Sequence, residues 1–390
     1  MSVVTVPVMM GLLAPGAAQA DHAATYNIQV GHEFFDQGLP AESMSFFPQR
    51  LTVHAGDTLN FVGGFHTATM IPANTEVLSW VDDNAGGIGK DWSFVTENPD
   101  GGEENPFKLN NRVFFPPQDC GPAANPCTYN GNDVVSSGAL FFHFEGEGPP
   151  GFHATVSDAL QPGDTFWVVC LIHPRMRMKV TVVDDSEATS TQAEIDAEAA
   201  TAQAQDFDAA SALHNRLLNK RTKRVVDGRV VWDAYAGFDT SRFSLFAMYP
   251  RVVRPRRGQT VRWHFDQLNF EDHTVTIPRR RGVQISNSEP ILCDPDDGVE
   301  GDETEPDFSQ GFPPSCPEGS EIELIVTANF AFEQGNGRWT GAGDFESSGV
   351  RGAQFESDPY DVRFTKPRKK AYKYVCMIHT NMVGRVKVRS

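Results

Sequence analysis

The chain has 390 residues, of which 40% are hydrophobic and 22% are charged, and its formal net charge is −18. This length is sufficient for two or three domains of ordinary globular composition. The acidic balance, concentrated between residues 21 and 185 with 7 basic and 21 acidic residues, argues against nucleic acid as a partner. The 34 glycines, the 26 prolines and the short alternating apolar runs favour an all-β fold.

The first 20 residues form a separate segment. Val3–Leu13 is a short apolar run, and Ala18-Gln19-Ala20 is a small-residue cleavage pattern, although the basic start of a typical signal peptide is missing. We predict a signal peptide at 1–20 that is cleaved after Ala20, and hence a periplasmic or secreted protein. No apolar stretch reaches the ~18–20 residues that a membrane span needs, so no span is predicted.

Three predicted strands open the first half of the chain. Alternating patterns predict strands at Tyr26–Val30, Phe46–Val53 and Thr58–Val62, and further on at Asp164–Val169 and Lys179–Val183. Residues 75–140 interrupt this pattern as a long irregular insert, and residues 287–360 form a second one.

The four cysteines of these inserts predict disulfides. Cys120 and Cys127 lie in one Pro/Gly/Asp-rich loop, and Cys293 and Cys316 lie in another. They lack the Cys-x-x-Cys spacing and the nearby histidines of a zinc site. We therefore predict the disulfides Cys120–Cys127 and Cys293–Cys316, which suit an oxidising compartment.

Residues 186–219 differ in composition from both flanking regions. Ala, Glu, Gln and Asp dominate, Gly and Pro are absent, and Thr191 with Glu194 fits a capping box. The apolar positions form only a thin stripe, which indicates a helix that lies over a domain surface. We interpret it as the connector between two domains.

The second half of the chain repeats the first. The corresponding segments are Glu42–Pro48 and Phe243–Pro250, Gly56–Phe61 and Gly258–Trp263, His66–Pro72 and His273–Pro278, and Ser136–Gly138 and Ser347–Gly349. Such repetition indicates a duplicated unit. The predicted organisation is domain 1 at 21–185, a helical linker at 186–222 and domain 2 at 223–390.

Metal-ligand residue types repeat in register. Cys170, His173 and Met176 recur 206 positions later as Cys376, His379 and Met382, and His66 recurs 207 positions later as His273. One thiolate, two imidazoles and a weak axial thioether are the donors of a blue-copper site. We predict two copper sites, with the ligands His66, Cys170, His173 and Met176 in one and His273, Cys376, His379 and Met382 in the other.

Met178 is an alternative axial ligand in the first site. Its equivalent 206 positions later is Gly384, which has no donor, whereas Met176 corresponds to Met382. The repeat therefore favours Met176, and Met178 is expected in the core.

These motifs resemble the cupredoxin family. The features that carry the resemblance are the Cys-x-x-His-x-x-Met loop, the Lys-Val-Thr-Val-type strand after it and the His-Thr far upstream. The short loop with Pro174 is most similar to amicyanin, because plastocyanins have two more residues before the methionine. The resemblance covers about 40–183 and 240–390 without the inserts. It implies a Greek-key β-sandwich in each half and one type 1 copper per domain.

The same resemblance bears on catalysis. Enzymes of this family, the multicopper oxidases and copper nitrite reductases, carry a histidine beside the copper cysteine, and the oxidases also carry His-x-His pairs. Here the cysteines are flanked by Val169 and Leu171 and by Val375 and Met377, and the sequence has no His-x-His. We interpret the protein as an electron carrier between redox protein partners, with no catalytic residues.

Two other functions remain open on the sequence alone. One is an oxidase or nitrite reductase with an unrecognised second copper centre, built from His143 and His153 at a subunit interface. The other is copper storage or resistance.

Overall fold

A computed structural model describes residues 23–116, 119–141, 150–265, 271–295, 304, 306–307, 316–317, 320–341, 343–352, 355 and 358–390. The predicted signal peptide and His143 lie outside these residues, so both predictions stay untested.

Strands dominate the first half of the chain. They are β1 (Thr25–Glu33), β2 (Ala41–Phe47), β3 (Arg50–Val53), β4 (Thr58–Gly63), β5 (Thr67–Met70), β6 (Val95–Glu97), β7 (Phe107–Leu109), β8 (Cys127–Tyr129), β9 (Val135–Ala139), β10 (Phe152–Val156), β11 (Thr165–Val169) and β12 (Arg177–Val182). Short helices accompany them: η1 (Phe35–Gln37), α1 (Val77–Asn84) and α2 (Asn111–Phe114).

The second half follows the long helix α3 (Gln192–Leu218). Its strands are β13 (Thr222–Val226), β14 (Arg229–Asp239), β15 (Phe243–Tyr249), β16 (Val252–Val253), β17 (Thr260–His264), β18 (Thr276–Ile277), β19 (Ile291–Asp294), β20 (Glu321–Val326), β21 (Arg338–Trp339), β22 (Glu346–Ser347), β23 (Tyr360–Phe364), β24 (Tyr372–Val375) and β25 (Val383–Val386). Its short helices are α4 (Arg279–Ser286) and α5 (Ala328–Ala331).

Each half is a sandwich of two sheets. One layer of the first half has the order β3-β12-β11-β5-β9, and the second half repeats it as β16-β25-β24-β18-β22. The facing layers are β2-β1-β4-β10-β8 and β21-β23-β17-β14-β15. Apolar side chains such as Phe61, Phe166 and Trp263 are fully buried in the core. The predicted all-β fold, with one β-sandwich in each half, is confirmed.

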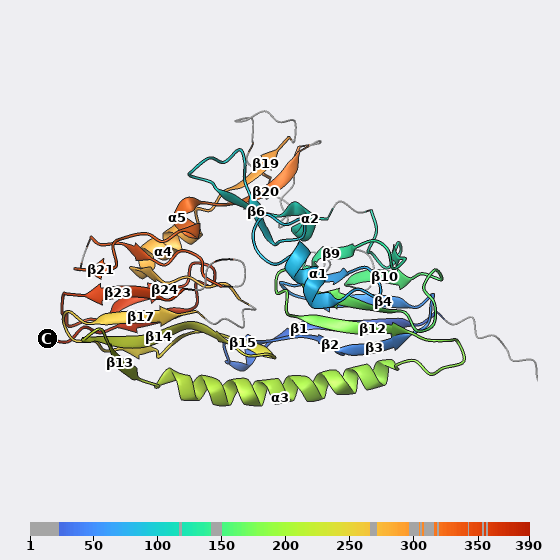
Figure 1. Ribbon diagram of the computed structural model, residues 1–390, viewed down its shortest axis with the longest axis horizontal. Coiled ribbons are helices and arrows are strands. Elements are labelled where there is room, and N and C mark those ends of the chain that lie inside the picture. Colours follow the sequence, from blue (N-terminus) through green and yellow to red (C-terminus); the bar gives the residue numbers. More distant parts are fainter. Residues whose placement is uncertain are drawn as a thin grey trace, which may run out of the picture.

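The two halves are joined edge to edge. Strands β2 and β15 pair antiparallel, so that one 11-stranded sheet runs through both halves (Figure 1). The register at this junction is Phe243 with Ser43, Ser244 with Glu42 and Leu245 with Ala41. An unpaired sheet edge is prone to association, and here each half covers the edge of the other.

The two inserts also meet. Strand β20 of the second insert pairs with β7 of the first, through Ile325 with Lys108 and Val326 with Phe107. Together with β6 and β19 they form a separate four-stranded sheet above the two sandwiches (Figure 1). The inserts therefore form a second connection between the halves, which the sequence did not indicate.

Helix α3 lies under the β2–β15 junction and contacts both halves (Figure 1). The predicted capping box is confirmed, because the Thr191 side chain accepts from the Glu194 N–H and the Glu194 side chain accepts from the Thr191 N–H. Asp206 is buried, accepts a hydrogen bond from Ser43 Oγ at 2.8 Å and forms an ion pair with Arg242 at 2.5 Å. The helix thus spans the junction instead of covering one domain.

Both predicted disulfides, Cys120–Cys127 and Cys293–Cys316, are confirmed.

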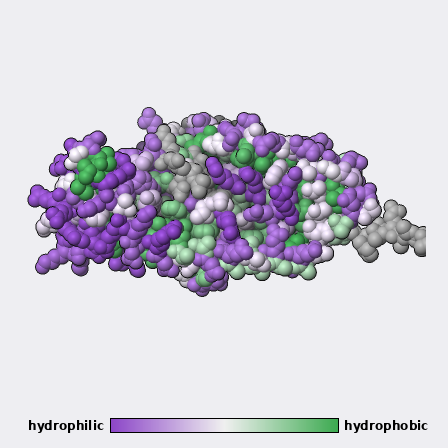
Figure 2. Space-filling view, turned by 60° about the horizontal axis from the view of Figure 1, so that its bottom comes forward, coloured by the Kyte–Doolittle hydropathy of each residue, from purple (hydrophilic) through white to green (hydrophobic). Residues whose placement is uncertain are grey.

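None of the helices in the described part of the chain is long and apolar enough to cross a membrane. The face in Figure 2 is largely hydrophilic, with hydrophobic residues in scattered groups.

Candidate metal centres

The predicted cysteine and histidine ligands come together as two groups. The donor atoms of His66, Cys170 and His173, here called centre 1, all lie within 4.8 Å of one another. The same holds for His273, Cys376 and His379, here called centre 2. Both cysteines are free thiols with no exposed surface.

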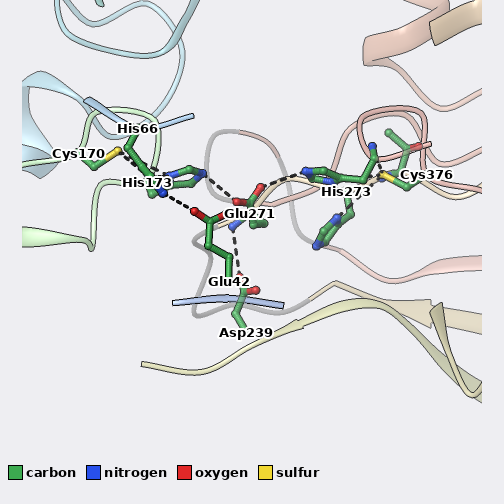
Figure 3. A network of polar contacts seen from close by, with 10 residues as sticks. Glu42, His66, Cys170, His173, Asp239, Glu271, His273 and Cys376 are labelled. Atoms are coloured by element: carbon green, nitrogen blue, oxygen red, sulfur yellow. Dashed lines mark hydrogen bonds and ion pairs between the residues drawn. The ribbon is translucent and has the colours of Figure 1, made fainter. Parts of the chain in front are cut away.

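In centre 1 both imidazoles direct Nδ1 toward the thiol. Cys170 Sγ lies 3.8 Å from Nδ1 of His66 and 3.6 Å from Nδ1 of His173, and these two nitrogens are 3.0 Å apart. Figure 3 shows the three side chains converging. Three donors that face one point without a protein group between them are arranged as metal ligands.

Centre 2 repeats this geometry. Cys376 Sγ lies 4.0 Å from Nδ1 of His273 and 3.8 Å from Nδ1 of His379. His273 is buried, whereas the side chain of His379 is 26% exposed, against 3% for its equivalent His173. The second centre is therefore more open to solvent at this one ligand.

The threonine after each upstream histidine explains the repeated His-Thr motif. The Thr67 N–H donates to Cys170 Sγ at 3.3 Å, and the Thr67 hydroxyl accepts from the Leu171 N–H at 2.8 Å. Thr274 makes the same two bonds, to Cys376 Sγ at 3.3 Å and from the Met377 N–H at 2.6 Å. Each threonine thus fixes the strand with the histidine to the loop with the cysteine.

The repeated Ser-Ser-Gly motif supports the same strands. Ser137 Oγ accepts from the Ala68 N–H at 2.8 Å, and Ser348 Oγ accepts from the Val275 N–H at 2.8 Å. The neighbouring serine of each copy pairs with a threonine hydroxyl, also at 2.8 Å. This network positions the segment that follows each upstream histidine.

Two glycines that the sequence analysis missed adjoin the same histidines. Gly31 and Gly237 lie 206 positions apart, and their φ angles are +71° and +74°. A Cβ at Gly31 would be 2.1 Å from Nε2 of His66, and one at Gly237 would be 2.0 Å from Nε2 of His273. Only glycine permits both this φ and this approach. The sequence could have revealed these glycines, because they are separated by the same 206 positions as the two copper-ligand loops.

Met178 occupies a core position. It lies in β12 opposite Val168, and it has no exposed surface. In the second half, Tyr374 takes the place of Val168, and its ring fills the space that a side chain at Gly384 would occupy, since a Cβ there would be 2.1 Å from it. Met176 and Met382, both 1% exposed, remain the predicted axial ligands.

Two carboxylates contact the outer nitrogens of the histidines, and neither was predicted. Nε2 of His66 donates to Glu42 Oε1 at 2.6 Å. Glu271 lies between His173 and the second centre (Figure 3). Its Oε1 is 2.9 Å from Nε2 of His173, and its Oε2 is 3.4 Å from Nε2 of His379. Among the described residues, Nε2 of His273 has no hydrogen-bond partner.

These carboxylates have no counterpart in the other copy. Counted back from the cis prolines Pro48 and Pro250, Glu42 corresponds to Ser244. By the 207-residue offset of the upstream histidines, Glu271 corresponds to Gly64. The repeat in the sequence reveals only residues that both halves have in common. Glu42 and Glu271 occur in one half only, so nothing in the sequence indicated that they contact the ligands.

The centres hold thiolates. Burial raises the pKa of the Cys170 thiol, but His173 and His66 have a larger, opposite effect and lower this pKa to about 5. Burial likewise opposes ionisation of Cys376, yet His273 and His379 hold its pKa well below the usual range. Because thiolates bind metal and thiols do not, both centres are prepared for a cation.

The histidines carry the compensating charge. Burial lowers the pKa of His66, but Glu42 and Cys170 raise it to about 9. Burial also lowers the pKa of His379, but Cys376 and Glu271 raise it to about 10. For Glu271, burial raises the pKa and the two histidines lower it well below the usual range. Each centre thus favours positive charge next to its thiolate, which a metal ion supplies when it displaces protons.

The donor set fits copper. A thiolate and two imidazoles, with a thioether in the adjoining turn, match the preferences of copper better than those of Mg²⁺ or Ca²⁺, which select oxygen ligands. Of the two histidines of the alternative second copper centre, His143 lies outside the described residues, and His153 lies in β10 with its Nδ1 3.3 Å from the Gly121 carbonyl oxygen. That alternative therefore stays untested.

No protein-family model and no curated protein matches this chain. Among solved structures it is similar to an oxidized amicyanin variant, with 14% identity over 44% of this chain and 100% of the other and a TM-score of 0.18. Auracyanin A from Chloroflexus aurantiacus has 15% identity over 42% and 100%, with a TM-score of 0.21. A copper-containing nitrite reductase from Thermus scotoductus has 12% identity over 94% and 68%, with a TM-score of 0.20.

Proposed function

We propose that the protein is an exported electron carrier that binds two copper ions, one at each centre. His66, Cys170, His173 and Met176 would hold the first, and His273, Cys376, His379 and Met382 the second. The observation that carries the proposal is the convergence of Nδ1, Nδ1 and Sγ in two groups, of which the first is buried and the second is exposed only at His379. A copper ion in such a ligand set supplies one-electron oxidation and reduction.

The residues around each centre suit this role. Thr67 and Thr274 donate backbone N–H groups to the thiolates, and such hydrogen bonds to the sulfur tune the reduction potential. Buried ligands that are held by a hydrogen-bonded framework change little between two charge states. Four protein donors per centre leave no position for a substrate, which favours an electron carrier over an enzyme.

Export is part of the proposal. The two disulfides are typical of an oxidising compartment. The signal-peptide pattern before Asp21 supports the same location. Electron donors and acceptors would then be other exported redox proteins. The proposal also includes two domains, 21–185 and 223–390, joined by the helical linker 186–222. Each domain would then hold one copper centre.

The proposal is tested by copper stoichiometry together with the optical spectrum. We expect two coppers per chain and an intense thiolate-to-copper absorption band in the visible range. Cys170→Ser and Cys376→Ser should each remove about one copper and about half of the band. A colourless copper-loaded protein would refute the assignment. More than two coppers per chain, with turnover of oxygen or nitrite, would instead favour the enzymatic alternative.

A further inference from the structure

One carboxylate lies between the two centres and contacts a ligand histidine of each. Glu271 Oε1 is 2.9 Å from Nε2 of His173, as Figure 3 shows, and Oε2 is 3.4 Å from Nε2 of His379. Both rings turn the opposite nitrogen, Nδ1, toward a cysteine, at 3.6 Å for Cys170 and 3.8 Å for Cys376. Each ring is therefore held from both sides, with the sulfur on one side and the shared carboxylate on the other.

Glu271 is held firmly in this position. Its side chain is only 10% exposed. Its backbone N–H donates to Asp239 Oδ2 at 3.3 Å, which ties it to the end of β14. It also lies two residues before His273, a ligand of centre 2, and the His273 backbone is paired with Arg351. A displacement of Glu271 would thus disturb His173 and His379 through space and His273 through the chain.

We infer that Glu271 is a positioning residue shared by the two centres, and that its two carboxylate oxygens orient one copper-ligating histidine in each. The inference rests on the proposed function, since it assumes that Nδ1 of His173 and of His379 binds the metal. A ring whose Nδ1 binds a metal carries its proton on Nε2 and donates it, so two such histidines require two acceptors. A carboxylate has two oxygens and serves both.

This arrangement makes the protein one unit with two coupled centres. The histidine edges of the two centres face each other across a single side chain, so each centre is the nearest redox neighbour of the other. Loss of an outer partner of a metal-bound histidine typically costs about 10- to 100-fold in metal affinity. Removal of Glu271 should therefore weaken both centres, although the residue belongs to only one half of the sequence.

Single-centre backgrounds separate the two effects. Cys376→Ser leaves centre 1, and Cys170→Ser leaves centre 2. In each background, copper affinity and the thiolate-to-copper band are measured with and without Glu271→Ala. We expect a loss of affinity of about 10- to 100-fold and a shifted band at both centres. Glu42→Ala, the matched control, removes a carboxylate that contacts His66 and no other of the described ligands of the two centres, and it should weaken centre 1 alone.

A conservative variant tests the two oxygens. The side chain of Glu271→Gln offers one carbonyl oxygen and one N–H₂ group, so it should restore copper affinity at one centre only. Arg242→Gln breaks the ion pair with Asp206 at the same junction without contact to either centre, and it should leave both affinities unchanged. Urea unfolding midpoints of the metal-free variants report whether each protein is folded.

Three results would overturn the inference. The first is an unchanged copper affinity and absorption band at either centre in Glu271→Ala. The second is wild-type copper affinity at both centres in Glu271→Gln. The third is a loss of copper affinity at both centres in Arg242→Gln that equals the loss in Glu271→Ala. If the wild-type protein binds no copper, the proposed function itself fails. If Glu271→Ala binds two coppers with normal affinity and a normal spectrum, only the shared role of Glu271 fails.

Discussion

A single methyl group at Gly237 should disable centre 2 and leave centre 1 intact. The Cβ of Gly237→Ala would lie 2.0 Å from Nε2 of His273, whereas ordinary contact begins near 3.4 Å, so the ring must move by about 1.4 Å. Ligand geometry tolerates about 0.5 Å, and we therefore expect loss of copper at this centre. The φ of +74° costs a non-glycine residue about 1–2 kcal/mol, and overpacking adds about 1–3 kcal/mol.

The control is a glycine with the same backbone conformation and free space. Gly228 has a φ of +73°, and a Cβ there meets nothing within 4 Å. Gly228→Ala should cost only the conformational part, about 1–2 kcal/mol, and keep both coppers. Urea unfolding of the metal-free protein and copper analysis measure the two effects. If Gly237→Ala binds two coppers, or unfolds at the same urea concentration as Gly228→Ala, the steric reasoning is wrong.

Two further predictions concern charge. Glu42→Gln should raise the reduction potential of centre 1 by on the order of 100 mV. The reason is that a unit charge beside His66 is worth roughly 2 kcal/mol at an effective dielectric constant of about 20, and a tenfold change in the equilibrium constant of a one-electron reduction corresponds to about 59 mV. An optical redox titration in which the potential of centre 1 does not change would contradict this prediction. Burial lowers the pKa of His214, so its contribution to stability is complete above about pH 6.5 and is lost as the pH falls through the lowered pKa. His214→Gln should make the urea midpoint less dependent on pH between about 7.5 and 5, and an unchanged dependence would argue against it.

The sequence was sufficient for features that a residue type or a repeat specifies. A capping box needs only Thr191 and Glu194 at the right spacing, and each disulfide joins cysteines of one loop. The cysteine and histidine groups were found because duplication preserved their spacing in both copies. Met178 could be placed in the core because its counterpart, Gly384, has no sulfur.

Contacts between the copies were not predictable in this way. Nothing in β2 or β15 alone indicates that the two strands pair, since each reads as an ordinary strand with its own sandwich. Strands β7 and β20 lie in inserts without a shared pattern, so their pairing left no repeat to detect. Glu271 contacts His173 across the junction, a relation between residues 98 positions apart that no local motif encodes.

The junction also explains why a glutamate stands at only one of the two equivalent positions, Glu42 and Ser244. In the β2–β15 register, Glu42 is opposite Ser244, which is its own counterpart in the other copy. Glutamate at both positions would set two buried carboxylates directly opposite each other, and like charges in such a pair are destabilising. A carboxylate partner is therefore available to the upstream histidine of one centre only. We expect centre 1, which has Glu42 in addition to its share of Glu271, to have the lower reduction potential, so that electrons pass from centre 1 to centre 2.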